Sequence, residues 1–220
     1  MLAPGFFGKV PGRGDFISRR LPPAIQQTWE TWLASLVVAA RHSLGADWPD
    51  AWLTAPLWHF SLGAALAPPT GAVGILVASV DRVDRYFPFS IIAAAQPGGY
   101  GDALTLDWSR AAESLILSAL DDKADPEALD AALVDLGAPY LATSPIHPSG
   151  QWPLALDGDW PLPDPDPLSH TSRLPPGPDQ SVWWCRGSDR MPPLHFRCTG
   201  LPGPHTTEAM VTGGFEFTPD

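Results

Sequence analysis

The chain has 220 residues, of which 45% are hydrophobic and 17% are charged, so it is long enough and apolar enough to bury a sizeable core. It carries 24 Asp and Glu against 13 Lys and Arg, a formal charge of -11, and a chain this acidic repels phosphate backbones, which argues against nucleic-acid binding through a broad basic face. No apolar run approaches the roughly 18 residues that a membrane span needs, and no secretory signal is present, so we expect a cytoplasmic protein without a membrane span.

The first half of the chain predicts one strand, one long helix, one short helix and then three strands. Pro22 and Pro23 are expected to open the long helix, where their missing N–H groups do no harm, and Gly45 is expected to end it. Apolar runs that contain Val and Ile indicate buried strands. In chain order the elements are a strand at 5–10, helices at 22–45 and 49–55, and strands at 57–62, 72–80 and 87–95.

The second half predicts two helices, a long coil, a hairpin and a final helix. Asp125 is the expected N-terminal cap of the second helix, and Gly137 ends it. Eleven prolines between residues 139 and 178 exclude a helix or a central strand there. We therefore predict a Pro-rich coil over 139–180, either a solvated linker or an ordered coil wrapped over the domain. The other elements are helices at 105–121 and 125–137, strands at 181–186 and 194–199, and a helix at 205–212.

The order of these elements indicates a sheet that is covered by helices on both faces. Consecutive strands without crossover helices pair antiparallel most simply, so we expect a mixed, largely antiparallel central sheet. This order differs from the strict alternation of strands and helices in a dinucleotide-binding fold. We expect residues 1–220 to form a single α/β domain, with the Pro-rich coil inside it.

Most catalytic and metal-binding signatures are missing from the sequence. It has no nucleophile elbow, no zinc-protease motif, no C-x-x-C pair and no calcium loop, and its six histidines show no metal spacing. Residues 5–9 resemble half of a phosphate-binding loop, but the Pro11 that follows lacks the N–H and the hydroxyl that such a loop needs. Cys185 and Cys198 are expected to be buried thiols, which face each other if the last two strands pair. We expect no catalytic residues, no metal and no cofactor.

Two charged clusters lie at the ends of predicted strands. Lys9, Arg13 and Asp15 follow the first strand, and Asp81, Arg82, Asp84 and Arg85 lie between the third and the fourth. If the two loops meet, they form a polar site. In the functional interpretation a Lys, two carboxylates and an Arg bind a small anion or perform acid–base chemistry. In the structural interpretation these groups satisfy the loop backbone and one another.

Ten tryptophans are many for this length, and exposed Trp and Arg are typical anchors of protein interfaces. Trp183 and Trp184 alternate across a predicted strand, so either one of them faces solvent or a partner, or both are buried. Because no reactive set is apparent, we expect a non-enzymatic protein that binds a partner. The candidate partner-binding or functional residues are Lys9, Arg13, Asp15, Ser79, Asp81, Arg85 and Trp184.

Seven short segments of the chain carry a resemblance to a known family. They are GKVPGRGDF at 8–16, LP at 21–22, WETWL at 29–33, LTAPLWHF at 53–60, SVDRVDRYFP at 79–88, SVWW at 181–184 and TGLP at 199–202. In this order they resemble the TagF/ImpM family of type VI secretion-associated proteins, and the resemblance spans nearly the whole chain. The family usually has Gly where this chain has Asp84. Since Asp tolerates a left-handed backbone, we expect that loop to keep its shape.

The resemblance implies a three-layer α/β/α sandwich and a cytoplasmic accessory protein of the bacterial type VI secretion system. Family members act as post-translational repressors of assembly, so we expect a negative regulator. The resemblance also implies a forkhead-associated scaffold protein as the partner. It makes a PP2C-type phosphatase, to which some relatives are fused, a second candidate in the same pathway. The alternative function is a small-anion sensor or enzyme that uses Lys9, Asp15, Asp81 and Arg85.

Overall fold

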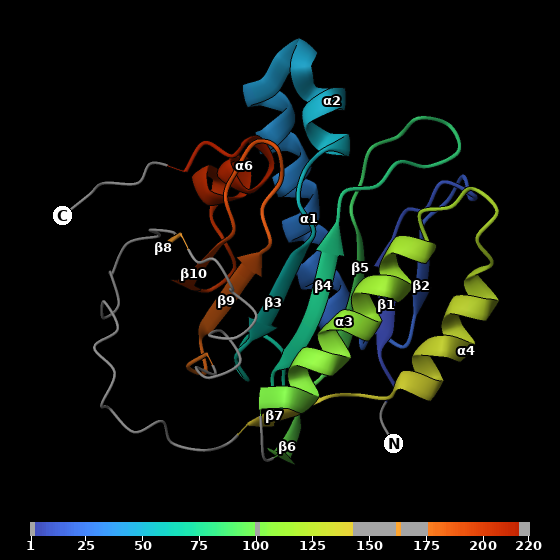
Figure 1. Cartoon of the computed structure of the whole chain (residues 1–220), viewed down its shortest axis with the longest axis vertical. Helices are drawn as coiled ribbons and strands as arrows, with labels where there is room; N and C mark the ends of the chain where they lie inside the picture. Colours follow the sequence, from blue (N-terminus) through green and yellow to red (C-terminus); the bar gives the residue numbers. More distant parts are fainter. Residues whose placement is uncertain (1–2, 100–101, 143–161, 164–175, 216–220) are drawn as a thin grey trace.

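The computed structural model describes residues 3–99, 102–142, 162–163 and 176–215, and these form three layers (Figure 1). Within the described residues the middle layer is an eight-stranded sheet with the order β2-β1-β5-β4-β3-β9-β10-β8, and neighbouring strands are antiparallel throughout. The strands are β1 (Gly5–Gly8), β2 (Ile17–Arg19), β3 (Trp58–Leu62), β4 (Ala72–Val77), β5 (Phe89–Ala94), β8 (Leu162–Pro163), β9 (Gln180–Cys185) and β10 (Leu194–Thr199).

Helices cover both faces of this sheet (Figure 1). One face packs against α1 (Pro23–Leu44), α2 (Trp48–Leu53) and α6 (Pro204–Thr212), and the other against α3 (Asp102–Ser118) and α4 (Pro126–Leu136). A short parallel pair, β6 (Gln96–Gly99) and β7 (Tyr140–Ala142), lies apart from the main sheet. The α/β/α sandwich with a largely antiparallel central sheet is confirmed. No helix in the described ranges is long and apolar enough to cross a bilayer.

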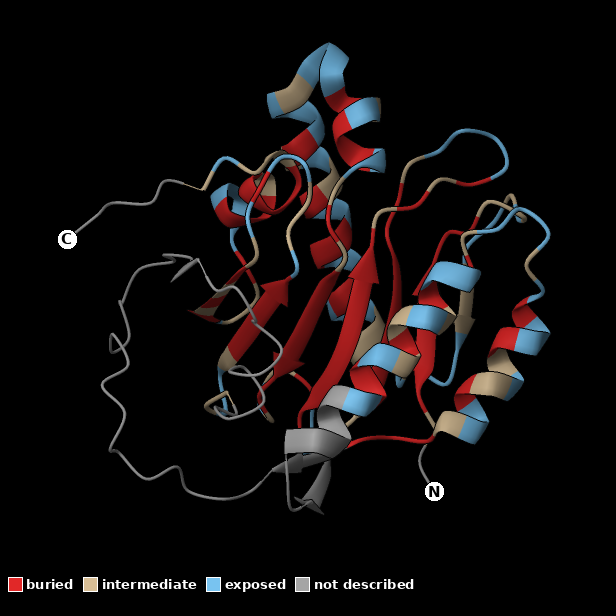
Figure 2. Ribbon diagram, viewed as in Figure 1, coloured by how far each residue is buried: buried red, intermediate tan, exposed pale blue. Residues whose placement is uncertain are grey.

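The central strands are buried on both faces, whereas the outer faces of the helices are exposed (Figure 2). In β4, Val73 and Ile75 pack in the core under α3 and α4, and Leu76 packs in the core of the opposite layer. Between them, a Cβ on Gly74 would lie 2.3 Å from the ring of Phe60. This position has to stay bare because the Phe60 ring of the neighbouring strand crosses over it.

The tryptophans that the structure describes are all core residues, which corrects the expectation that exposed Trp anchors a partner. Of the two alternatives for Trp183 and Trp184, burial of both is the one observed, on opposite faces of β9. Buried indole groups need hydrogen-bond acceptors, and most of these side chains find one in the protein. The indole N–H groups of Trp29, Trp32, Trp52, Trp58, Trp108 and Trp183 donate to protein oxygens at 2.8–3.0 Å.

Most predicted elements are present with slightly shifted ends. Gly45 follows α1 with a φ of +54°, and Asp125 caps α4 by accepting a hydrogen bond from the N–H of Glu127 at 3.1 Å, as predicted. The sequence pattern does not predict β2, β6, β7 and β8, because two to four residues carry too little periodicity. β7 and β8 lie within the predicted Pro-rich coil, and β8 takes an edge position, where proline is tolerated. Residues 143–161 and 164–175 of that coil lie outside the described residues.

Candidate functional site

The two charged loops meet at one end of the sheet. Because β1 and β5 are antiparallel neighbours, the turn after β1 (residues 9–16) lies beside the connection from β4 to β5 (residues 78–88). The N–H of Arg82 donates to the carbonyl oxygen of Arg13 at 3.1 Å, which joins the two segments directly. We call residues 9–16 and 78–88 the paired loops. Asp84 adopts a φ of +60°, so the prediction that Asp tolerates this conformation is confirmed.

Asp81 is the centre of the paired loops. It is 3% exposed, and its carboxylate accepts four hydrogen bonds. Lys9 Nζ and Arg85 Nε donate to Oδ2, the latter at 2.7 Å, while the backbone N–H groups of Val83 and Arg85 donate to Oδ1 at 2.9 and 3.0 Å. The Arg85 guanidinium also donates to the carbonyl oxygen of Gly14. One carboxylate therefore fixes both loops.

The electrostatics of this cluster are those of an internal ion pair. Burial by itself would raise the pKa of Asp81, but the hydrogen bonds from Lys9, Arg85 and Val83 outweigh it and hold the pKa well below its usual value. Lys9 is itself only 5% exposed, so its charge is neutralised within the protein. Four donors occupy the lone-pair sites of one carboxylate, which leaves it no further acceptor position for chemistry. This geometry fits the structural interpretation of the cluster.

Asp15 and Ser79 do not join the ion pair. Asp15 is exposed, and its carboxylate makes no hydrogen bond or ion pair within the described residues. Ser79 is buried beneath the loops, where its carbonyl oxygen accepts from the indole of Trp52 at 2.8 Å and from the N–H of Phe87 at 3.1 Å. Its hydroxyl oxygen has no partner among the residues that the structure describes. The structure thus unites Lys9, Asp81 and Arg85 from the predicted set.

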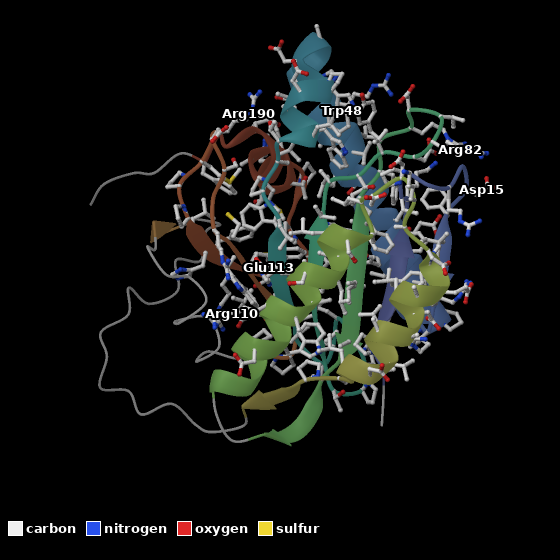
Figure 3. All side chains as sticks on the ribbon, turned by 45° about the vertical axis from the view of Figure 1, so that its right-hand side comes forward. Asp15, Trp48, Arg82, Arg110, Glu113 and Arg190 are labelled. Atoms are coloured by element: carbon white, nitrogen blue, oxygen red, sulfur yellow. The ribbon has the colours of Figure 1, made fainter. Side chains whose placement is uncertain are left out.

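The outer surface of the paired loops carries arginines and apolar side chains. Arg13 and Arg82 are exposed, and in the described part of the chain neither guanidinium forms an ion pair or a hydrogen bond. The Arg82 guanidinium extends over Gly14, 3.8 Å from where a Cβ would stand. Phe16 and Val83 are 46% and 56% exposed. Figure 3 labels Asp15 and Arg82 at the outer edge of the molecule.

Phe16 is held firmly although it is half exposed. Its ring stacks on Phe7 with centroids 5.6 Å apart and an interplanar angle of 11°, and it meets Phe87 edge-on at 4.8 Å. Lys9 Nζ lies 4.8 Å from the centre of the same ring. Aromatic pairs and cation–π contacts of this kind restrict a side chain to one position. The exposed edge of Phe16 is therefore a fixed feature of the surface.

A second polar cluster, on the α3 face of β3 and β9, was not predicted. His59 is buried, its ring stacks on Trp184 at 5.4 Å, and its Nε2 lies 3.3 Å from the carboxylate of Glu113. Arg186 approaches the same carboxylate at 3.4 Å. Burial lowers the pKa of His59, although Glu113 acts in the opposite direction. No local motif marks these residues, because the pairing of β3 with β9 brings His59 beside Trp184 and Glu113 joins them from α3.

The cysteines do not face each other, which corrects that prediction. The register of β9 and β10 places Cys185 opposite Leu194 and Cys198 opposite Ser181. Both cysteines are buried and free. Burial raises the pKa of Cys185 to about 11, so its thiol stays protonated at neutral pH and is a poor nucleophile.

No metal-ligand group lies at the paired loops as the structure describes them, and a small apolar pocket reaches their base, where its lining includes Trp52, Ala78 and Pro88. Within the described ranges, no three His, Cys, Asp or Glu residues gather as metal ligands would. An open depression of about 410 Å³ lies at the connection between β9 and β10, where Arg186, Asp189 and Arg190 contribute to its lining. Figure 3 labels Arg190 there, across the molecule from Asp15.

Comparison with known proteins finds a family model and a similar solved structure. The family model of the TagF N-terminal domain, which is type VI secretion system-associated, matches residues 5–136. The chain is similar to the crystal structure of PA0076 from Pseudomonas aeruginosa PAO1, with 33% sequence identity and a TM-score of 0.74, over 99% of this chain and 97% of that one. No curated protein matches the chain. The matched range 5–136 includes both of the paired loops.

Proposed function

The chain belongs to the family of type VI secretion-associated proteins that share the TagF N-terminal domain, and from this membership we propose that it is a cytoplasmic accessory protein that represses assembly of the secretion apparatus. It acts by binding a protein partner and not by catalysis. The proposed partner is the forkhead-associated scaffold protein of the system. A PP2C-type phosphatase is the second candidate in the same pathway.

The geometry of the Asp81 carboxylate supports binding over anion sensing or catalysis. An anion that entered the cluster would have to displace Asp81 from Lys9 and Arg85. That displacement would leave a buried carboxylate without its charged partners, which costs several kcal/mol. Asp15, the second carboxylate of the alternative site, is exposed and makes no contact with this ion pair. The ion pair therefore fixes the shape of the loops and does not make them reactive.

We propose in addition that residues 1–220 act as one domain. The matched family range ends at residue 136, but β9 lies beyond it and pairs with β3 in the middle of the sheet. α6 packs against α1 on the same core. Strand pairing and helix packing of this extent across the range boundary support a single cooperative unit.

Deletion of the encoding gene tests the repressor role. We expect secretion of a type VI substrate to rise several-fold in the deletion strain, with more assemblies of the fluorescently tagged scaffold protein per cell. Expression of the wild-type chain from a second locus should restore the low level. Unchanged secretion and unchanged scaffold assembly in the deletion strain would contradict the proposal.

A ligand screen tests the anion-sensing alternative. Thermal unfolding of the purified chain is measured with and without inorganic phosphate and ATP, each at about 10 mM, a concentration at which even millimolar affinity stabilises a protein measurably. We expect no shift of Tm beyond that given by sodium chloride of equal ionic strength. A specific rise in Tm that Arg85→Ala abolishes would favour the anion site.

A further inference from the structure

We propose that the outer surface of the paired loops, formed by Arg13, Phe16, Arg82 and Val83, is the docking surface of this protein. The occupant is a segment of a protein partner in which Asp or Glu side chains flank an apolar residue. This inference deepens the proposed function, on which it rests, by assigning the surface and the chemistry of the partner. We call the surface formed by these four residues the loop surface.

Charge is the first argument. The chain carries a formal charge of -11, yet two exposed guanidiniums stand on the loop surface without a carboxylate. Asp15 and Asp84 lie on the same loops, but the structure pairs neither with Arg13 or Arg82. Guanidinium groups bind carboxylates in a bidentate manner. Free arginines on an acidic protein therefore fit a partner that supplies the carboxylates, and the overall charge disfavours a nucleic acid in the same place.

The apolar side chains are the second argument. Phe16 and Val83 are 46% and 56% exposed; Val83 directly follows Arg82, and Phe16 lies three residues after Arg13 on the same loop. Arginine and aromatic side chains at the centre of a patch are the residues that dominate binding energy in protein interfaces. Phe16 and Val83 would contact an apolar side chain of the partner, while the arginines bind the flanking carboxylates.

Rigidity is the third argument. Asp81 ties Lys9 to Arg85, and Arg85 in turn donates to the carbonyl oxygen of Gly14, directly beneath the loop surface. Phe16 is fixed by Phe7, Phe87 and Lys9, as described above. A surface that is already ordered loses little conformational entropy on binding. The buried ion pair thus has a role beyond stability, because it fixes the backbone that carries the two arginines and helps to hold Phe16 in place.

Site-specific photo-cross-linking in cells tests the docking surface. p-Benzoylphenylalanine is placed at position 16 of the full chain and, as a matched control, at position 134, since Val134 of α4 is likewise half exposed. After irradiation, the cross-linked peptide is identified by mass spectrometry. We expect position 16 to capture the scaffold protein at an Asp- or Glu-rich segment and position 134 to give no such product.

Charge reversal gives a second, independent readout with purified scaffold protein as the probe. We expect Arg13→Glu with Arg82→Glu to weaken binding by about 100-fold, since each residue is expected to contribute as an interface hot spot. Arg41→Glu on α1 reverses an equally exposed arginine away from the loop surface and should leave Kd unchanged. Far-UV circular dichroism confirms that each variant is folded.

The outcomes separate the two proposals. If the wild-type chain binds no scaffold protein but position 16 captures an acidic segment of another type VI component, the proposed partner is wrong and the docking surface stands. If the scaffold protein binds equally well to the double variant and to the wild type, the docking surface is overturned and the proposed function stands. No product at position 16, equal products at both positions, a captured segment without carboxylates, or a nucleic-acid adduct would each overturn the docking surface.

Discussion

Replacement of Asp81 by Asn removes one negative charge from the paired loops while keeping the size and shape of the side chain. The amide oxygen can still accept from the backbone N–H groups of Val83 and Arg85. The amide NH₂ group, however, then faces two donors, Lys9 Nζ and Arg85 Nε. Lys9 is left as a buried charge without its partner.

The size of the destabilisation by Asp81→Asn follows from how deeply Asp81 and Lys9 are buried. Removing one member of a buried pair costs about 3–5 kcal/mol in the free energy of unfolding. The Asp81–Lys9 contact falls in this class, because the two side chains are 0% and 6% exposed. Arg85 adds less, since its side chain is 55% exposed and solvent screens it. We therefore expect Asp81→Asn to destabilise the protein by about 3–5 kcal/mol at neutral pH.

Urea unfolding followed by tryptophan fluorescence measures this change. Asp15→Asn is the matched control, because it neutralises an exposed carboxylate on the same loops, and we expect it to stay within about 0.5 kcal/mol of the wild type. The double variant Lys9→Met with Asp81→Asn should lose less than the sum of the two single variants, with a coupling of about 1–3 kcal/mol. Equal effects of Asp81→Asn and Asp15→Asn, or strictly additive single variants, would refute the ion-pair argument.

Two further predictions concern the sheet. Gly74→Ala should destabilise the protein by more than about 2 kcal/mol, because the new Cβ would stand 2.3 Å from both the Phe60 ring and the Ile91 carbonyl oxygen; a urea midpoint equal to that of the wild type would disprove the close approach. Because the pKa of His59 is lowered in the folded protein, the unfolded chain binds a proton at His59 more readily. The contribution of neutral His59 to stability is therefore complete above the unfolded pKa of 6.5, and it declines as the pH falls from 6.5 toward the folded pKa. As the pH is lowered from about 8 to about 5, the free energy of unfolding should therefore decrease more steeply in the wild type than in His59→Gln. Parallel curves for the two proteins would contradict this. The pKa of Glu113 is also lowered, so its contribution to stability is complete above its usual pKa of 4.5 and is lost only as the pH falls below that value, outside this window.

The sequence predicts well those features that local patterns determine. Asp125 followed by Pro126 marks the start of α4, and Gly45 marks the end of α1, because helix ends have few chemical solutions. Local patterns also place both charged clusters at the ends of buried strands, whereas their meeting depends on the pairing of β1 with β5. What local sequence does not predict is which carboxylate is buried. Asp15 and Asp81 look alike in sequence, and the antiparallel pairing of β1 with β5 decides that Lys9 contacts Asp81.

Contacts between strands that are distant in sequence determine the features that local patterns do not predict. Trp184 is a candidate for partner binding only if its side chain is exposed. It is instead buried beside His59, because β9 pairs with β3. Glu113 joins this cluster from α3, a contact that no spacing along the chain reveals. Long-range register of this kind is a property of the whole sheet, so single-sequence patterns carry little information about it.

Titration of the purified chain into the purified forkhead-associated scaffold protein tests the central claim most directly. Isothermal titration calorimetry should show saturable binding with one site and a Kd of about 50 µM or tighter, corresponding to a binding free energy of about -6 kcal/mol or better. The chain should leave the scaffold chemically unaltered, as mass spectrometry of the recovered protein can establish. Absence of binding at concentrations well above this range, or conversion of the scaffold to a modified form, would contradict a protein that acts by docking alone.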